Sequence, residues 1–255
     1  MATTYKTGVS KAKANTTAET LRWSENEMLW GPAIKKIFVD MAPTDNDMDA
    51  LTKIELFAAG NPIWRLNELQ FNAVMSTLAK REVAGATVKR FTIDFSLFGM
   101  VDGGCAPNKA LSLEITTDNT GANGTWRIGY EVSDAPGKAY PTLLAQDMNI
   151  GASAAPGTYT FTQRGLLRGF VLPRTTSIDQ LQLWDSGGNQ IWTLNTEGLI
   201  LQAQDYISGF STTLNKLFLL PEPFMLPGGR VELTVDGSFV ATDQIVPWVD
   251  QPVEA

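Results

Sequence analysis

The sequence predicts an all-β protein made of two tandem β-sandwiches, each with one short helix. Three observations support this fold class: a hairpin sequence that occurs twice, many short strand-like runs, and one helical segment after each hairpin. The strand-like runs are about five to nine residues long and are separated by Gly, Pro, Asn and Asp, which is typical of antiparallel sandwiches.

The repeat is the strongest signal. The segment IELFAAGNPIWRLN at 54–67 returns as LQLWDSGGNQIWTLN at 181–195, and eight of fourteen positions match when one gap is allowed. The offset of 127 to 128 residues is half of the 255-residue chain. Solenoid repeats have much shorter periods of about 20 to 50 residues. The repeat therefore predicts duplication of a whole domain, and each half is expected to fold alone.

Each copy of the repeat is predicted to form a β-hairpin. Apolar residues alternate with polar ones, and Gly-Asn or Gly-Gly-Asn stands between the two runs, where a turn needs positive φ. The aromatic residues that flank the turn are predicted to be core anchors that fix the register, since burial of one ring contributes about 2 to 3 kcal/mol. These anchors are Phe57, Trp64, Trp184 and Trp192. The alternative for the Trp pair is an exposed stacking surface for a ligand.

The remaining elements follow in order. Strands are predicted over 33–41, 88–100, 110–118 and 125–134 in the first half, and over 157–173, 212–226, 230–237 and 238–248 in the second. Apolar residues at helical spacing predict helices over 69–83 and 196–210. The Gly-, Ala- and Pro-rich segment 136–157 is predicted to be a linker. We therefore expect an N-terminal arm over 1–30, a first sandwich over 31–145 and a second over 146–255.

Composition excludes several chemistries. The chain has no His and a single Cys, Cys105, so an intrachain disulfide, Ser-His-Asp or Cys-His catalysis and a His-containing zinc site are excluded. A carboxylate pair of the glycosidase kind remains open. The acids in or beside strand-like runs are Glu55, Asp94, Glu114, Glu131, Asp185 and Glu232. Their spacing pairs no two of them, so we expect no catalytic residues and no cofactor.

The run DNDMD has the alternating acids of a calcium loop at Asp45, Asp47 and Asp49. Ala50 stands where such a loop needs its turn glycine, and Leu56 stands where it needs its closing Glu. The run is therefore not an EF-hand, although a looser calcium site stays open as an alternative. No phosphate-binding glycine loop is present in the sequence.

Charge is unevenly distributed. The net charge of −7 and pI near 4.7 oppose binding to nucleic acid. Residues 1–22, however, carry Lys6, Lys11, Lys13 and Arg22 against Glu19 alone. This segment is interpreted as a polar arm, disordered in isolation, that could meet an acidic surface such as lipid headgroups; an ordinary solvated tail is the alternative. We expect cytoplasmic synthesis, because the N-terminus lacks the apolar stretch of a signal peptide.

A duplicated all-β unit of this size, with a helix after an xLxLxxxGxxIWxLN hairpin, no catalytic set and a basic N-terminal segment, resembles a known family. The resemblance is to double jelly-roll major capsid proteins of membrane-containing icosahedral bacteriophages, closest to the small corticovirus-like type, over residues 30 to 250. It implies two eight-stranded jelly rolls per chain and trimers whose six jelly rolls mimic a hexagon. It also implies partners and location: neighbouring capsomers, minor capsid or penton proteins, an internal lipid membrane that meets Lys6, Lys11, Lys13 and Arg22, and residence in the virion.

Three other functions are compatible with the residues. A tandem β-sandwich that binds carbohydrate would use some of the seven Trp residues as stacking platforms. A glycan-cleaving enzyme would need two of the carboxylates listed above. A phage spike or fibre component would also form trimers, but its repeats would more often be several short units.

Overall fold

The structure is a computed structural model that describes residues 3–13, 18–24, 27, 33–42, 51–79, 90–95, 111–118, 124–133, 139–147, 157–163, 165–173, 178–204, 216–225, 229–235 and 243–252. Several sequence predictions fall outside these ranges. They concern Asp45, Asp47 and Asp49 of the calcium alternative, Cys105 and Trp30.

The described residues form strands and two helices in the following order: β1 (Thr3–Thr7), β2 (Lys11–Lys13), β3 (Glu19–Trp23), β4 (Ala33–Ala42), β5 (Leu51–Ala58), β6 (Asn61–Asn67), α1 (Glu68–Ala79), β7 (Arg90–Asp94), β8 (Leu111–Thr117), β9 (Gly124–Ser133), β10 (Ala139–Leu144), β11 (Gln146–Asp147), β12 (Gly157–Gln163), β13 (Leu166–Leu172), β14 (Ile178–Trp184), β15 (Gln190–Asn195), α2 (Thr196–Gln204), β16 (Lys216–Met225), β17 (Gly229–Val235) and β18 (Gln244–Pro252).

The chain divides by its internal packing into two compact units. Unit 1 comprises Met1–Phe71, Val83–Pro141 and Gln251–Ala255, and unit 2 comprises Asn72–Glu82 and Thr142–Asp250. The division falls within α1, β10 and β18, and the first residues of β10 belong to unit 1.

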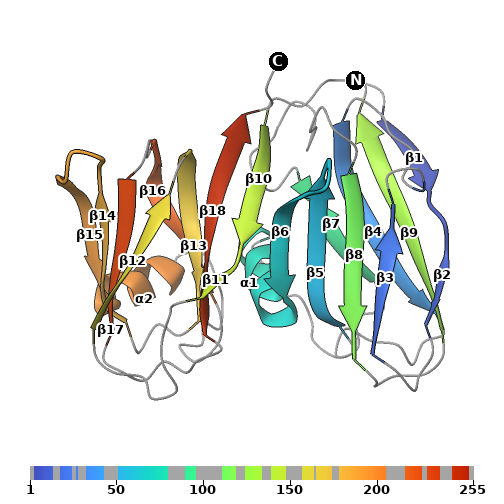
Figure 1. The fold of residues 1–255 in the computed structure, drawn as a ribbon, viewed down its shortest axis with the longest axis horizontal. Coiled ribbons are helices and arrows are strands. Elements are labelled where there is room, and N and C mark those ends of the chain that lie inside the picture. The colour runs from blue at the N-terminus through green and yellow to red at the C-terminus, as the bar shows by residue number, and fades with distance from the viewer. Residues whose placement is uncertain are drawn as a thin grey trace. The chain divides into compact units, whose positions relative to one another are not determined.

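Unit 1 contains two antiparallel sheets (Figure 1). One has the strand order β1-β9-β4-β7, with β2 also paired to β9. The other has the order β6-β5-β8-β3, and the start of β10, residues 139–141, follows β6. The rings of Trp64 in β6 and Phe95 next to β7 meet edge to face at 5.6 Å, so the two sheets share one core.

Unit 2 repeats this arrangement. One sheet has the order β12-β17-β14-β15, and the other contains β16-β13-β18 with β11 paired to β18. Its core cluster takes Phe170 from β13, Leu181 from β14, Val231 from β17 and Val249 from β18. Both sheets of unit 2 therefore contribute to a core of their own, as the duplication predicts.

The two series of elements correspond one to one. β5 lies between β6 and β8, and β14 lies between β15 and β17; likewise β4 lies between β7 and β9, and β13 lies between β16 and β18. In chain order β10, β11 and β12 open the second series as β1, β2 and β3 open the first. The duplication seen in one hairpin thus extends over all the described strands.

The repeated hairpins share their register residue by residue. Leu56 faces Trp64 and Leu183 faces Trp192, and a bulge follows this pair in each copy. The turns contain Gly60 at φ 81° and Gly188 at φ 82°, so the positive φ expected at the turn glycines is confirmed.

Three expectations differ from the structure. The predicted linker 136–157 contains β10 and β11. The run 157–173 is two strands, β12 and β13, because Gly165 between them has φ 105°. Residues 3–7, 11–13 and 19–23, expected in a disordered arm, form β1, β2 and β3, which pair with β9 and β8.

Candidate interaction surfaces

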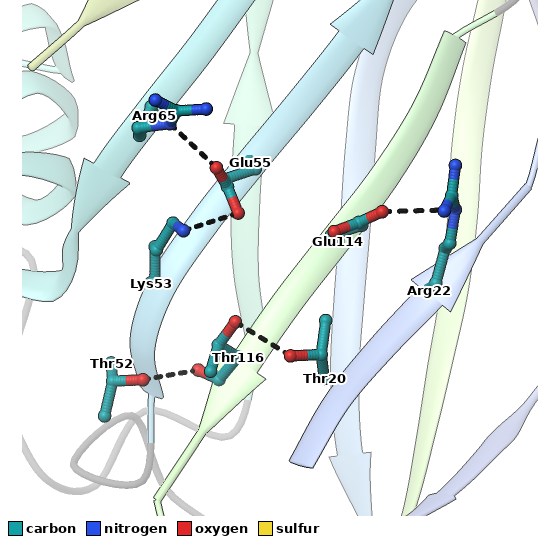
Figure 2. A network of polar contacts seen from close by, with 8 residues as sticks. All are labelled: Thr20, Arg22, Thr52, Lys53, Glu55, Arg65, Glu114 and Thr116. Atoms are coloured by element: carbon teal, nitrogen blue, oxygen red, sulfur yellow. Dashed lines mark hydrogen bonds and ion pairs between the residues drawn. The ribbon is translucent and has the colours of Figure 1, made fainter. Parts of the chain in front are cut away.

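The outward face of the β6-β5-β8-β3 sheet carries a row of charged side chains, drawn in Figure 2. The register places Glu55 opposite Arg65 on one side and opposite Glu114 on the other. Arg22 of β3 completes the row opposite Glu114. Two carboxylates thus stand side by side on neighbouring strands, flanked by two guanidinium groups.

Cationic neighbours neutralise both carboxylates. Arg65 Nε lies 2.8 Å from Glu55 Oε1, and Lys53 Nζ lies 2.7 Å from Glu55 Oε2. Arg22 Nε lies 3.1 Å from Glu114 Oε1. Like charges directly opposite each other on a sheet are destabilising, and the three cations offset that repulsion. Only Glu55 is well buried, at 7% exposure, so the outer ends of the row present positive charge to solvent.

Below this row lies a neutral polar one, also seen in Figure 2. Thr52 Oγ1 donates to the backbone oxygen of Thr116 at 3.0 Å, and the hydroxyls of Thr20 and Thr116 are 3.2 Å apart. Cross-strand Thr pairs of this kind stabilise a sheet by a few tenths of a kcal/mol up to about 1 kcal/mol. The face as a whole is polar and hydrogen-bonded, and it suits contact with a complementary polar surface.

The other candidate carboxylates lie apart from this row and have local partners. Lys36 Nζ lies 3.0 Å from Asp94 Oδ2, and this hydrogen bond raises the pKa of Lys36. Arg230 Nε lies 2.7 Å from Glu232 Oε1 in unit 2. Glu131 lies on β9 opposite Lys36.

Asp185 closes the turn of the second hairpin. It accepts hydrogen bonds from the backbone and side-chain nitrogens of Asn189 at 2.8 and 2.9 Å. The bond from the Asn189 side chain is the largest cause of a lowered pKa at Asp185. Of the six candidate acids, Glu55 and Glu114 stand directly opposite each other on paired strands, and Asp94 and Glu131 lie on either side of Lys36. Arg65 and Lys53 pair with Glu55, and Arg22 pairs with Glu114, so the row is a charge ladder of ion pairs across the sheet.

The four cations of the N-terminal segment lie on strands of unit 1. Lys6 is on β1, Lys11 and Lys13 are on β2, and Arg22 is on β3. Lys11 forms an ion pair with Glu27, which lowers the pKa of Glu27, and Arg22 pairs with Glu114 as described above. Trp23 at the end of β3 is fully buried, and its Nε1 donates to the Val9 carbonyl at 2.6 Å.

The predicted anchors of the two hairpins differ in burial. Trp64 is fully buried and its Nε1 donates to the carbonyl of Pro141 at 2.9 Å, inside unit 1. Trp192 and Phe57 are half-buried, as is Trp184, whose ring lies 4.5 Å from the guanidinium carbon of Arg230. The two copies of one hairpin therefore present different surfaces.

The edge strand of unit 2 shows the difference most clearly. β15 ends the sheet order β12-β17-β14-β15 within the described residues, and Ile191 on it is 40% exposed. In β6, by contrast, the corresponding Ile63 is buried at 4% exposure.

The residue that ends each repeat has a role that the sequence reading missed. Asn67 and Asn195 are the N-caps of α1 and α2: Asn67 Oδ1 accepts from Gln70 N, and Asn195 Oδ1 accepts from Gly198 N, each at 2.9 Å. Gln70 Oε1 in turn accepts from Asn67 N at 2.9 Å, which completes a capping box in the first copy. The signal was available, since Asn directly precedes an apolar-periodic segment in both copies.

The described residues contain neither a metal-binding cluster nor a membrane-spanning helix. Over the described ranges, no group of three or more His, Cys, Asp or Glu side chains is placed to hold a metal ion. In the same part of the chain, neither helix has the length and apolar character that a membrane crossing requires.

Solved structures with this fold cover nearly the whole chain. The major capsid protein P2 from bacteriophage PM2 is similar with a TM-score of 0.70 at 9% identity, over 99% of this chain and 98% of that one. A quasi-atomic model of the PBCV-1 virus capsid gives a TM-score of 0.54, and PBCV-1 VP54 fitted into a reconstruction of the virophage Sputnik gives 0.52. Both are 9% identical and cover 98% of this chain and 93% of theirs.

No protein-family model matches the chain, and no curated protein matches its sequence. At such low identity the likeness establishes the fold, and the arrangement is that of double jelly-roll capsid proteins. The predicted fold class, all-β with two tandem jelly rolls and short helices, is thereby confirmed.

Proposed function

We propose that this chain is a major capsid protein, a structural subunit of a virion shell and not an enzyme. The observation that carries the proposal is the end-to-end similarity to the PM2 capsid protein, which covers 99% of this chain and 98% of that one. The matched length includes both copies of the duplicated series, so the whole architecture is shared. The charge ladder on the β6-β5-β8-β3 sheet supports a surface made for contact, because its carboxylates are paired with cations.

In this proposal three copies form a trimer whose six jelly rolls act as a pseudo-hexamer. Trimers then tile an icosahedral shell together with neighbouring capsomers and minor capsid or penton proteins. The duplication supplies a physical reason, since a tile with six similar sides can be built from three chains only if each chain presents two similar units. The two hairpins with equal register and unequal burial fit this requirement.

The shell is further proposed to enclose an internal lipid membrane that meets Lys6, Lys11, Lys13 and Arg22. Positive charge near an anionic bilayer contributes about 1 kcal/mol per cation. Lys11 and Arg22 have carboxylate partners, so part of their charge is already neutralised. A variant with Lys6→Glu and Lys13→Glu is expected to assemble particles that retain less lipid. Full lipid retention by that variant would contradict the membrane contact and leave the capsid role intact.

The capsid proposal is tested by the native mass of the purified protein, measured by light scattering after size exclusion. The expected mass is three times the 27.8 kDa of one chain. Electron micrographs of material concentrated under assembly conditions should then show closed shells. A protein that stays monomeric across the accessible concentration range would contradict the proposal.

The carbohydrate-binding alternative gains no support from the tryptophan positions. Of the six described Trp residues, Trp23, Trp64, Trp126 and Trp248 are buried. Trp184 is half-buried with Arg230 over its ring, and Trp192 packs partly against the core of unit 2. A sugar ring needs an open aromatic face to stack on, and none of the four buried rings offers one.

A further inference from the structure

The second strands of the two repeated hairpins, β6 and β15, are equivalent in the duplication, but they differ in how deeply their side chains are buried. β6 is buried along its apolar positions, and Trp64 Nε1 donates to the Pro141 carbonyl. β15 has the same register on its partner strand, yet Ile191 is 40% exposed and Trp192 is only half-buried. β15 occupies the position in unit 2 that β6 occupies in unit 1, but it ends its sheet order within the described residues. Its outer edge is therefore a surface on which a strand of another chain can pair.

The residues of β15 also favour pairing. Exposed edge strands usually carry charges or Pro that prevent association with other chains. β6 has Pro62 and Arg65, whereas β15 has Gln190 and Thr193 at the matching positions, so its sequence QIWTLN contains neither charge nor Pro. The side chains of Trp192 and Leu194 pack against the core of unit 2. This packing fixes β15 in the extended conformation that strand pairing requires.

The first copy shows what kind of segment covers such a strand. Residues 139–141, at the start of β10, follow β6 in the sheet order and supply the Pro141 carbonyl. β10 opens the second series of elements, and the element that opens the first series is β1. β10 pairs with β6, and β1 (Thr3–Thr7) is the strand that corresponds to β10 in the first series. β1 is therefore the equivalent of the strand that pairs with β6.

β1 is suited to this role. It is the last strand of the order β1-β9-β4-β7 within the described residues, and Tyr5 on it is 72% exposed. Its sequence TTYKT is short, polar and extended, which suits addition to the edge of another sheet through main-chain hydrogen bonds.

We propose that β15 of one chain pairs with β1 of a second copy, and that Trp192 Nε1 donates to a main-chain carbonyl of that β1. The contact is heterologous, because two different surfaces meet, so each chain offers one β15 and one β1. Three copies close such contacts into a ring and leave no free β15. The inference rests on the proposed trimer and names the contact that forms it.

The test uses two variants of the full chain, Ile191→Lys and Tyr5→Lys. A charge on an edge strand opposes pairing, so each variant alone is expected to associate at least about tenfold more weakly than the unsubstituted protein, as measured by light scattering. Tyr5 is 72% and Ile191 40% exposed, so each lysine can reach solvent and little change in folding is expected. Leu201→Lys and Leu69→Lys are matched controls, since these leucines are 64% and 49% exposed on the helices and should leave the trimer intact.

Mixing the variants identifies the pairing partner. The Tyr5→Lys chain has an intact β15 and the Ile191→Lys chain an intact β1, so the mixture should form dimers of one copy of each. Self-pairing of β15 would instead leave Tyr5→Lys fully associated and give no mixed dimer, which would overturn the inference. If both variants remain trimers, the β15–β1 contact is wrong and the capsid proposal stands. If the unsubstituted protein is monomeric, it is the proposed function that fails.

Discussion

At the scale of single residues, the caps of the two helices are duplicated but unequal. Asn67 shares a reciprocal capping box with Gln70, whereas Asn195 caps Gly198, which has no side chain to return the bond. We predict that Asn67→Ala lowers the free energy of unfolding by about 1 to 2 kcal/mol and Asn195→Ala by about 1 kcal/mol. Urea unfolding measures both. Asn67→Ser keeps a capping oxygen and should stay close to the unsubstituted protein, and an equal loss from Ser and Ala would contradict the capping role.

A second residue-scale prediction concerns Lys36 at alkaline pH. The hydrogen bond to Asp94 is the largest cause of its raised pKa, and the charge of Glu131 adds to it. A raised pKa in the folded state means that this contribution is fully present below the unfolded value of about 10.4, and is lost as pH rises through the folded value. Lys36→Met should therefore flatten the alkaline loss of stability.

Urea midpoints measured from pH 8 to 11.5 check this expectation. Asp94→Asn serves as the control, because it removes the same hydrogen-bonded charge pair and should give the same flattening. The double variant should add nothing further. An alkaline slope that remains unchanged in Lys36→Met would show that other groups cause it.

At the scale of elements, the bulge in β13 depends on one glycine. The register of β13 on β16 shifts between Leu167 and Gly169, and a Cβ added at Gly169 would lie 2.2 Å from the backbone oxygen of Phe218. Backbone cannot retreat as a flexible side chain can, so we predict that Gly169→Ala costs at least about 2 kcal/mol. Gly129 on β9 is the matched control, since its Cβ would meet its nearest neighbour at 3.5 Å.

Gly129→Ala is accordingly expected to change the free energy of unfolding by no more than about 0.5 kcal/mol. Thermal or urea unfolding of the two variants, compared side by side, decides the matter. Equal destabilisation would mean that the lost flexibility of glycine matters here and the close approach to Phe218 does not.

The elements that the sequence predicted well are those with local signals. The hairpins combine alternating apolar residues with Gly-Asn turns, and both lie where expected with the predicted positive φ. The sequence did not predict β1, β2, β3, β10 and β11, because nothing in a short window favours a strand there. These segments become strands through pairing with distant partners. The Gly, Ala and Pro content of segment 136–157 predicts a linker, although β10 and β11 lie within it.

The same limit applies to the charge ladder. Glu55 and Glu114 are far apart in the chain, and no spacing rule joins them. They become neighbours only through the register of β5 on β8, which the sequence does not encode locally. The N-caps are different: Asn67 and Asn195 could have been assigned from sequence, because a cap is a local feature.

At the scale of the whole molecule, the duplication gives the chain two copies of one series of strands. Equivalent residues in the two copies can be compared, and the comparison distinguishes residues that stabilise a unit from residues that are available for contact with another chain. An anchor that is buried in both copies serves the fold of each unit. An anchor that is buried in one copy and half-exposed in the other, as Trp64 and Trp192 are, serves the fold in the first and is available to a partner in the second.

This distinction leads to a prediction about Trp64→Ala and Trp192→Ala. Under dilution to monomers, Trp64→Ala should cost about 3 to 5 kcal/mol, because it removes a fully buried ring and leaves the Pro141 carbonyl without its donor. Trp192→Ala should cost about half as much, since the ring loses less contact. The order should reverse for trimer formation, which Trp192→Ala weakens and Trp64→Ala spares wherever the latter chain still folds. Urea unfolding at low concentration and light scattering at high concentration measure the two effects on the same samples. If Trp192→Ala reduces stability and leaves association unchanged, the second copy of the anchor serves the fold alone.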